Sequence, residues 1–308
     1  MKRTFSEFAT FLAVLLLPAL YWVSGWQVAT SPERPFLAGL LSVLALVAGA
    51  LILYLTSDRA LNEMSPVAPF AYLVLATVQP ASLYVSPLHG AAVLLAASLY
   101  FHLNYCAAHP TLGNLAGAGL TLGGASLFFP PLLWLAPVYA ATAFGRSEDK
   151  LKFGVTALLC LLLPLGAYVG VESILGSGPA DILPGYWAQM IQVTTPTIHY
   201  SVATLCRILL TLAVALLAIV QFLNRLNRYR TAQYRAAIRL VLLSLAIGLL
   251  ALLFLSDGRL PAAMITALPV SLLLNDCLCE TEHRNRGMIT LLIVLLLVLI
   301  AERITYFV

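Results

Sequence analysis

The sequence predicts an all-α, polytopic transmembrane helix bundle. Of its 308 residues, 61% are apolar and only 10% are charged, whereas about a quarter of the residues of a soluble domain are charged. The mean hydropathy is +0.94, and the apolar residues form long runs between short polar turns. Because a helix needs about 20 apolar residues to cross a bilayer, such runs predict membrane spans. We expect a single integral-membrane domain covering residues 1–308.

The polar turns divide the chain into about eleven spans. The first half gives Phe8–Trp26, Phe36–Thr56, Val67–Leu83, a fourth span ending near Cys106, and a pair within Gly113–Phe144. The second half gives Phe153–Val171, Tyr200–Leu223, Leu240–Leu255, Pro261–Leu278 and Met288–Ile304. Lys2 and Arg3 precede the first span, but no clear small-residue cleavage site follows it, so we expect an uncleaved span.

Small residues dominate the stretch Gly113–Phe144. It contains two G-x-x-x-G spacings, Gly113/Gly117 and Gly119/Gly123. Helices in lipid associate through close backbone approach at small residues, so this part should pack inside the bundle. Pro130 and Pro131 should end the helix near Phe129. The segment that follows, Leu132–Phe144, is barely long enough to span, so the stretch forms either two short spans or a re-entrant pair added to nine spans.

The basic residues predict a cytoplasmic N-terminus, because Lys and Arg gather in cytoplasmic loops. In that orientation the inner loops hold Lys2, Arg3, Arg59, Arg146, Lys150, Lys152, Arg225, Arg228, Arg230, Arg235, Arg239, Arg284 and Arg286. The outer loops hold only Arg34, Arg259 and Arg303. The long loop Glu172–His199 is therefore expected outside, where Tyr186 and Trp187 suit an interfacial anchor.

Few ionisable residues fall where they could carry chemistry. Glu33 and His89 lie in the first two predicted outer turns, and such a pair could supply an acid and a base. The alternative is that each is a solvated loop residue. Arg207 lies about 10 Å from the outer end of its span and could hold a phosphate, pair with an acidic residue, or snorkel to the surface. His102 and Asn104 are expected just to reach the inner interface.

Several chemistries find no motif in this chain. There is no phosphate-binding Gly-rich loop, no zinc-protease pattern and no nucleophile elbow, so no nucleotide or metal cofactor is implied. Cys277 and Cys279 lack the paired spacing of a metal site, and all five cysteines should be free thiols. The basic residues sit in short inter-helix loops and do not indicate nucleic-acid binding. The bilayer is the partner that the composition implies.

Short motifs along nearly the whole chain carry a first resemblance. They are Asn62-Glu63, Ser65-Pro66, Val78-Gln79-Pro80, Leu83-Tyr84-Val85-Ser86-Pro87, the run Gly119–Pro131, Leu163-Pro164 and Ala267–Ser271. In this order they resemble an uncharacterised family of polytopic inner-membrane proteins from Bacteroidota-type bacteria. The resemblance implies a multi-pass protein of the bacterial inner membrane and carries no activity with it.

A second resemblance covers about the first half. Tyr84–Tyr105 followed by Gly119–Pro131 is similar to the luminal-facing spans of GT-C glycosyltransferases. Those enzymes use polyprenyl-phosphate sugars, an acidic residue in the first outer loop, and a lysine before a Pro-Pro pair. Here Phe128 or Phe129 stands at the lysine position.

The second resemblance implies a protein that acts on lipid-linked sugars in envelope glycan assembly. Glu33 and His89 would then be catalytic, and Arg207 and Tyr84 would bind a polyprenyl-phosphate-linked substrate. The alternatives are a non-enzymatic membrane partner or assembly factor, and a small-molecule transporter. No convincing internal repeat favours the transporter.

Overall fold

Helices make up every regular element of the part of the chain that the structure describes. The structure is a computed structural model that describes residues 35–61, 66–77, 86–107, 111–146, 150–176, 178–193, 202–225, 231–254 and 262–279. The α-helices are α2 (Pro35–Leu61), α3 (Val67–Ala76), α4 (Pro87–Ala107), α5 (Leu112–Phe128), α6 (Ala136–Arg146), α7 (Lys150–Ile174), α8 (Pro179–Ile191), α9 (Val202–Arg225), α10 (Thr231–Phe254) and α11 (Ala262–Cys279), and the 3-10 helix η2 (Pro130–Leu135) joins α5 to α6.

The lengths and composition of the helices support a membrane protein. Four of them, α2, α4, α7 and α10, are long and apolar enough to cross a membrane, and shorter apolar helices lie within α3, α9 and α11. This agrees with the predicted all-helical bundle. The predicted spans Phe8–Trp26 and Met288–Ile304 lie outside the described residues, so the total of about eleven spans stays a prediction.

Two helix boundaries differ from the predicted ones. The segment Asn224–Arg239 was expected to be a polar loop, but α10 begins at Thr231 and includes Arg235 and Arg239. Similarly, α2 continues to Leu61 through residues that were expected to form a turn. Hydropathy marks where a helix enters the apolar layer, whereas backbone hydrogen bonding continues into the polar region beyond it. Long basic side chains fit that region because their apolar stems cover the helix surface.

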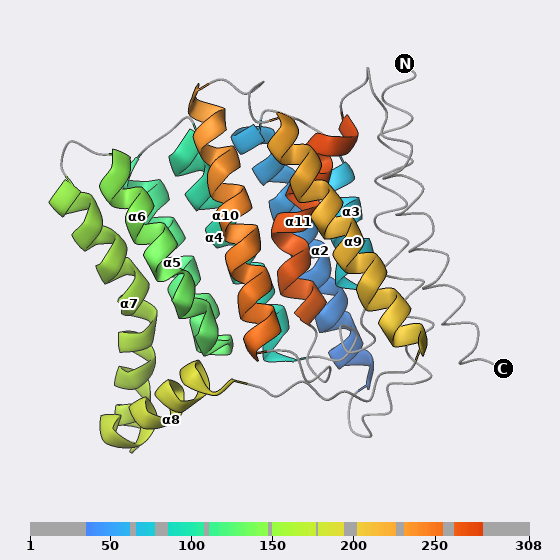
Figure 1. The fold of residues 1–308 in the computed structure, drawn as a ribbon. Helices are drawn as coiled ribbons and strands as arrows, with labels where there is room; N and C mark the ends of the chain where they lie inside the picture. The colour runs from blue at the N-terminus through green and yellow to red at the C-terminus, as the bar shows by residue number, and fades with distance from the viewer. Residues whose placement is uncertain are drawn as a thin grey trace.

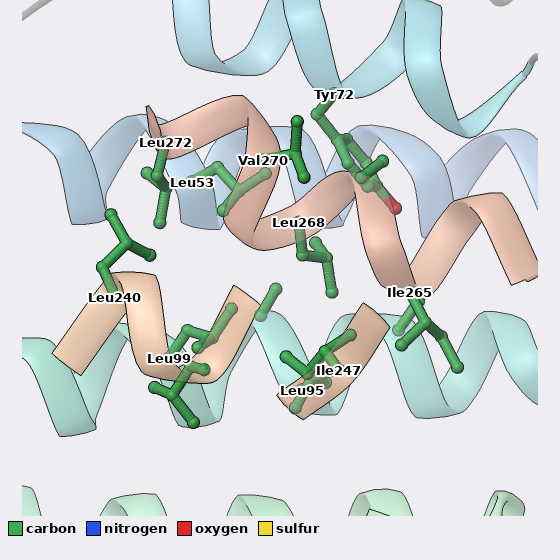
Figure 2. Packing of buried hydrophobic residues seen from close by; sticks show 14 of the residues in the cluster. Leu53, Tyr72, Leu95, Leu99, Leu240, Ile247, Ile265, Leu268, Val270 and Leu272 are labelled. Carbon is green, nitrogen blue, oxygen red and sulfur yellow. The ribbon is translucent and has the colours of Figure 1, made fainter. Parts of the chain in front are cut away.

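The core of the bundle surrounds α11. This helix packs against α2, α3, α4, α9 and α10, and Figure 2 shows buried side chains from several of these helices converging on Leu268 and Val270. The short helix α3 is almost wholly buried. Its N-terminus needs an acceptor inside the protein, and Oδ1 of the buried Asn275 on α11 accepts a 3.2 Å hydrogen bond from the Ala68 backbone N–H.

The helices alternate in direction between two ends of the bundle (Figure 1). At one end, which we call the basic end, α4, α6 and α9 finish and α5, α7 and α10 begin. The described helix termini there carry Arg146, Lys150, Lys152, Arg225 and Arg235. The opposite end carries α8, which contains Asp181, and the last turn of α7, which contains Glu172. The described helix termini that flank these predicted inner loops thus lie at one end, and the assignment of that end to the cytoplasm stays a prediction.

The segment Glu172–His199 was predicted to be a long loop, and that prediction was wrong for its first two thirds. Residues up to Ile174 continue α7, and α8 occupies Pro179–Ile191. Figure 1 shows α8 lying across the end of the bundle rather than along it. Tyr186 donates a hydrogen bond to Ser126 of α5, and Trp134 Nε1 donates to the Met190 carbonyl at 3.1 Å. Trp187 is exposed, as an interfacial anchor would be.

Candidate functional site

Only part of the predicted site can be placed. Glu33 and Tyr84 lie outside the described residues. Arg207 belongs to α9, which packs against α11, but its side chain is not among those described. His89 is the one predicted site residue whose side chain has a described environment.

His89 lies in the first turn of α4 and is 5% exposed. It was expected in a solvated outer turn, but Ser86-Pro87 begins a helix there, with proline at the position where a missing N–H costs nothing. The Ser86 backbone N–H donates to His89 Nδ1 at 3.3 Å, which is the reciprocal contact of a capping box. Nδ1 therefore accepts, and in the neutral ring the hydrogen resides on Nε2. This geometry gives the imidazole a role in starting α4.

A buried polar cluster joins α4 to α6. It consists of Ser98, His102, Tyr139 and Thr142, all buried. The rings of His102 and Tyr139 lie against each other with centroids 4.1 Å apart. Ser98 Oγ is 2.8 Å from the Tyr139 hydroxyl and 3.0 Å from the Ala118 carbonyl of α5. His102 and Asn104 were expected to reach the interface, but helix packing covers both side chains.

The hydroxyl partners fix the protonation pattern of this cluster. A carbonyl only accepts and a hydroxyl has one hydrogen, so the consistent arrangement has Ser98 donating to Ala118 and Tyr139 donating to Ser98. Thr142 Oγ1 donates to the Val138 carbonyl at 2.8 Å. It therefore accepts from His102 Nε2, which is 3.5 Å away. This leaves Nδ1 of His102 as an acceptor, and it has no hydrogen-bond partner among the residues that the structure describes.

The cluster was not predicted, although α4 carries a signal for it. Ser98 and His102 are four residues apart, so they share one face of an apolar helix. Tyr139 and Thr142 are three apart on α6 and meet them only in the folded bundle. Interhelical hydrogen bonds of this kind contribute about 0.6 kcal/mol each in a membrane, while an unpaired buried acceptor costs about 1–3 kcal/mol. The cluster therefore fixes how α4, α5 and α6 pack more than it stabilises them.

An apolar groove lies on the other side of Tyr139, between α5, α6 and α7. Its volume is about 330 Å³, at the lower end of the range of small-molecule pockets. Its walls include Leu115, Gly119, Ala140, Gly154 and Leu161, together with the ring of Tyr139. Of the predicted site residues, only His89 has a described side chain, and it does not line the groove.

The G-x-x-x-G spacings predicted to mediate close packing do so at three of four glycines. A Cβ on Gly123 would overlap the Leu161 carbonyl oxygen of α7, and one on Gly119 would lie 3.0 Å from the Ala157 carbonyl oxygen. Gly117 instead faces Phe101 of α4, while Gly113 meets nothing within 4 Å. The first spacing therefore does not act as a pair, because only Gly117 is in contact. The helix ends at Phe128, where the Pro-Pro pair follows, as predicted.

A third pair, Gly166 and Gly170, has no partner within the described chain. Neither has a neighbour within 4 Å of the position a Cβ would take. With 3.6 residues per turn, Gly166 lies on the face of α7 opposite Ala157, which packs on α5. The alternating spacing of four and three residues adds Leu159, Leu163 and Ser173 to the same face. We call these five residues the outer seam of α7, and all five are exposed.

Comparison with known proteins finds no matching family model, no matching curated protein and no matching solved structure.

Proposed function

We propose that this protein is a membrane-embedded partner protein that holds a transmembrane helix of another polypeptide against the outer seam of α7. The supporting observation is the exposure of α7 itself. Only 6% of its apolar window is buried inside the protein, and its contacts involve α5, α6 and α8. Among the described residues, one face of α7 is therefore left uncovered.

The glycines make lipid an unsatisfactory partner for that face. Each glycine inside a helix costs about 0.5–1 kcal/mol relative to alanine. At Gly119 and Gly123 the cost is offset because the α7 backbone approaches closely. Gly166 and Gly170 have the same spacing without that compensation in the described chain, which supports a contact with a helix from outside it. The seam also has the a and d spacing by which helices interlock.

Bulky substitutions test this proposal. Gly166→Ile and Gly170→Ile should reduce the size of the complex extracted from membranes in mild detergent, because β-branched side chains would hold the partner helix away. Gly248→Ile is the matched control, since Gly248 is also exposed on a membrane helix with nothing within 4 Å. A complex of unchanged size in both seam variants, or one lost equally in the control, would contradict the proposal.

The enzyme alternative rests on residues that the structure does not bring together in a described site. Its acid, Glu33, and its proposed substrate contact, Tyr84, lie outside the described residues, and the His89 imidazole is engaged with Ser86. Action on a polyprenyl-phosphate-linked sugar therefore stays a prediction. The substitution Glu33→Gln tests it, because a variant that inserts normally and shows no phenotype would remove this alternative.

A further inference from the structure

We propose that the apolar groove between α5, α6 and α7 binds one acyl chain of an anionic phospholipid, taken from the leaflet at the basic end of the bundle. This site is distinct from the outer seam, because none of the five seam residues lines the groove. The inference therefore does not depend on the proposed function.

The groove matches one leaflet in length. Along α7 its lining runs from Leu151 to Leu161, which is about 15 Å at 1.5 Å per residue. One leaflet contributes half of the roughly 30 Å apolar layer. Since Leu151 is the second residue of α7, the groove begins at the basic end and stops near the middle of the apolar layer. An acyl chain anchored at that surface occupies the same depth.

The lining favours a hydrocarbon chain over a polar ligand. Small residues from all three helices leave the space that the chain fills, among them Gly119, Ala136, Ala140, Gly154 and Ala157. Among the described lining residues, Tyr139 is the one with a polar side-chain atom, and its hydroxyl is engaged with Ser98. The ring therefore presents carbon to the groove, and the described lining offers no free side-chain hydrogen-bonding group that would select a sugar or a nucleotide.

The charges at the open end favour an anionic headgroup. Lys150 and Lys152 flank the lining residue Leu151, and Arg146 ends α6 beside them in sequence. Glu148 and Asp149 belong to the connection between α6 and α7, outside the described residues, and leave one net positive charge on 146–152. The start of α7 adds the positive end of its helix dipole. Basic pockets between membrane helices bind anionic headgroups in this way.

Native mass spectrometry of the purified full-length protein tests the proposal. The protein is titrated in detergent with phosphatidylglycerol and, separately, with phosphatidylethanolamine of the same chains. We expect one phosphatidylglycerol molecule to bind more tightly than phosphatidylethanolamine. Equal retention of the two lipids would overturn the proposal, as would tighter retention of a polyprenyl phosphate than of phosphatidylglycerol.

Variants separate the chain site from the headgroup site. Ala140→Phe places a ring in the groove and should abolish the tight site, whereas Ala141→Phe, on an exposed position of α6 outside the lining, should leave it intact. Lys150→Gln with Lys152→Gln should weaken phosphatidylglycerol binding about thirty-fold, at about five-fold per lysine. Arg235→Gln, at the same end on α10, should have no such effect.

The acidic residues of the connection give a test of sign. Glu148→Gln with Asp149→Asn should strengthen phosphatidylglycerol binding, because it removes negative charge from the residues that directly precede Lys150 in the sequence. These acidic and lysine substitutions remain informative if Ala140→Phe fails to fold. A phosphatidylglycerol affinity that changes with neither the lysine substitutions nor the acidic substitutions would overturn the proposal.

Discussion

Replacing Gly123 by alanine should separate α5 from α7, and the structure sets the size of the effect. The added Cβ would overlap the Leu161 carbonyl oxygen and lie 3.1 Å from Pro164 Cδ. Both are held by the α7 backbone or ring, so neither can rotate away. Overpacking of this kind costs about 1–3 kcal/mol, and we expect Gly123→Ala to lower the free energy of unfolding by the upper part of that range.

Alanine at two other glycines of α5 should change the free energy of unfolding less than it does at Gly123. At Gly119 the nearest atom to the new Cβ is the Ala157 carbonyl oxygen at 3.0 Å, so a shift of a few tenths of an ångström suffices and the loss should be about 1 kcal/mol. At Gly113 nothing lies within 4 Å, and because this glycine is the second residue of α5, alanine should stabilise the helix by less than the roughly 0.5–1 kcal/mol expected in a helix interior.

A reversible unfolding titration in mixed detergent micelles measures the three variants under one condition. The order of stability should be Gly113→Ala, then wild type, then Gly119→Ala, then Gly123→Ala. A Gly123→Ala protein as stable as the wild type would refute the backbone contact between α5 and α7.

Three further predictions concern the rest of the described chain. His89→Ala should lower the free energy of unfolding by about 1 kcal/mol, and His89→Gln should recover most of it because glutamine can accept from the Ser86 N–H; equal losses in that titration would contradict the capping role. Tyr139→Phe should weaken the contact of α4 with α6 by about 0.6 kcal/mol, and a matching loss in Ser98→Ala with no further loss in the double variant would show that the two act through one hydrogen bond. Burial raises the pKa of Tyr186, although its hydrogen bond to Ser126 acts in the opposite direction. The contribution of the Tyr186 hydroxyl should therefore be complete below the ordinary tyrosine value of about 10 and disappear as pH rises through the raised pKa. Tryptophan fluorescence should then report release of Trp134 from Met190, and Tyr186→Phe should remove the pH dependence.

Patterns local to one segment predicted much of this fold. The Pro130-Pro131 pair ended α5 where expected. Gly119 and Gly123 pack against another helix, as predicted, because helices in a bilayer associate through close contact at small residues. The sequence did not indicate α8, since Gly178, Pro179 and Pro184 read as loop residues. In the structure Pro179 occupies the first turn of α8, where proline is tolerated, and the Met190 carbonyl near the end of α8 accepts a hydrogen bond from Trp134.

The candidate sites depended on contacts between segments. The prediction of a turn at His89 was wrong because Ser86 and Pro87, which favour the N-cap and first position of a helix, begin α4 there. The His102 cluster joins residues about 40 positions apart, so only the shared α4 face of Ser98 and His102 was visible in advance. The groove could not be predicted, because its space lies between small residues of three helices that meet only in the folded bundle.

Photo-crosslinking from the outer seam is the most direct test of the central claim. A photoreactive residue replaces Leu163, which is 59% exposed beside Gly166, and in a control replaces Leu44 of α2, which is 54% exposed. In native membranes position 163 should give one defined protein adduct that Gly170→Ile abolishes, and its mass distinguishes a second copy from another protein. Lipid adducts alone at position 163, or the same protein adducts at position 44, would contradict the account.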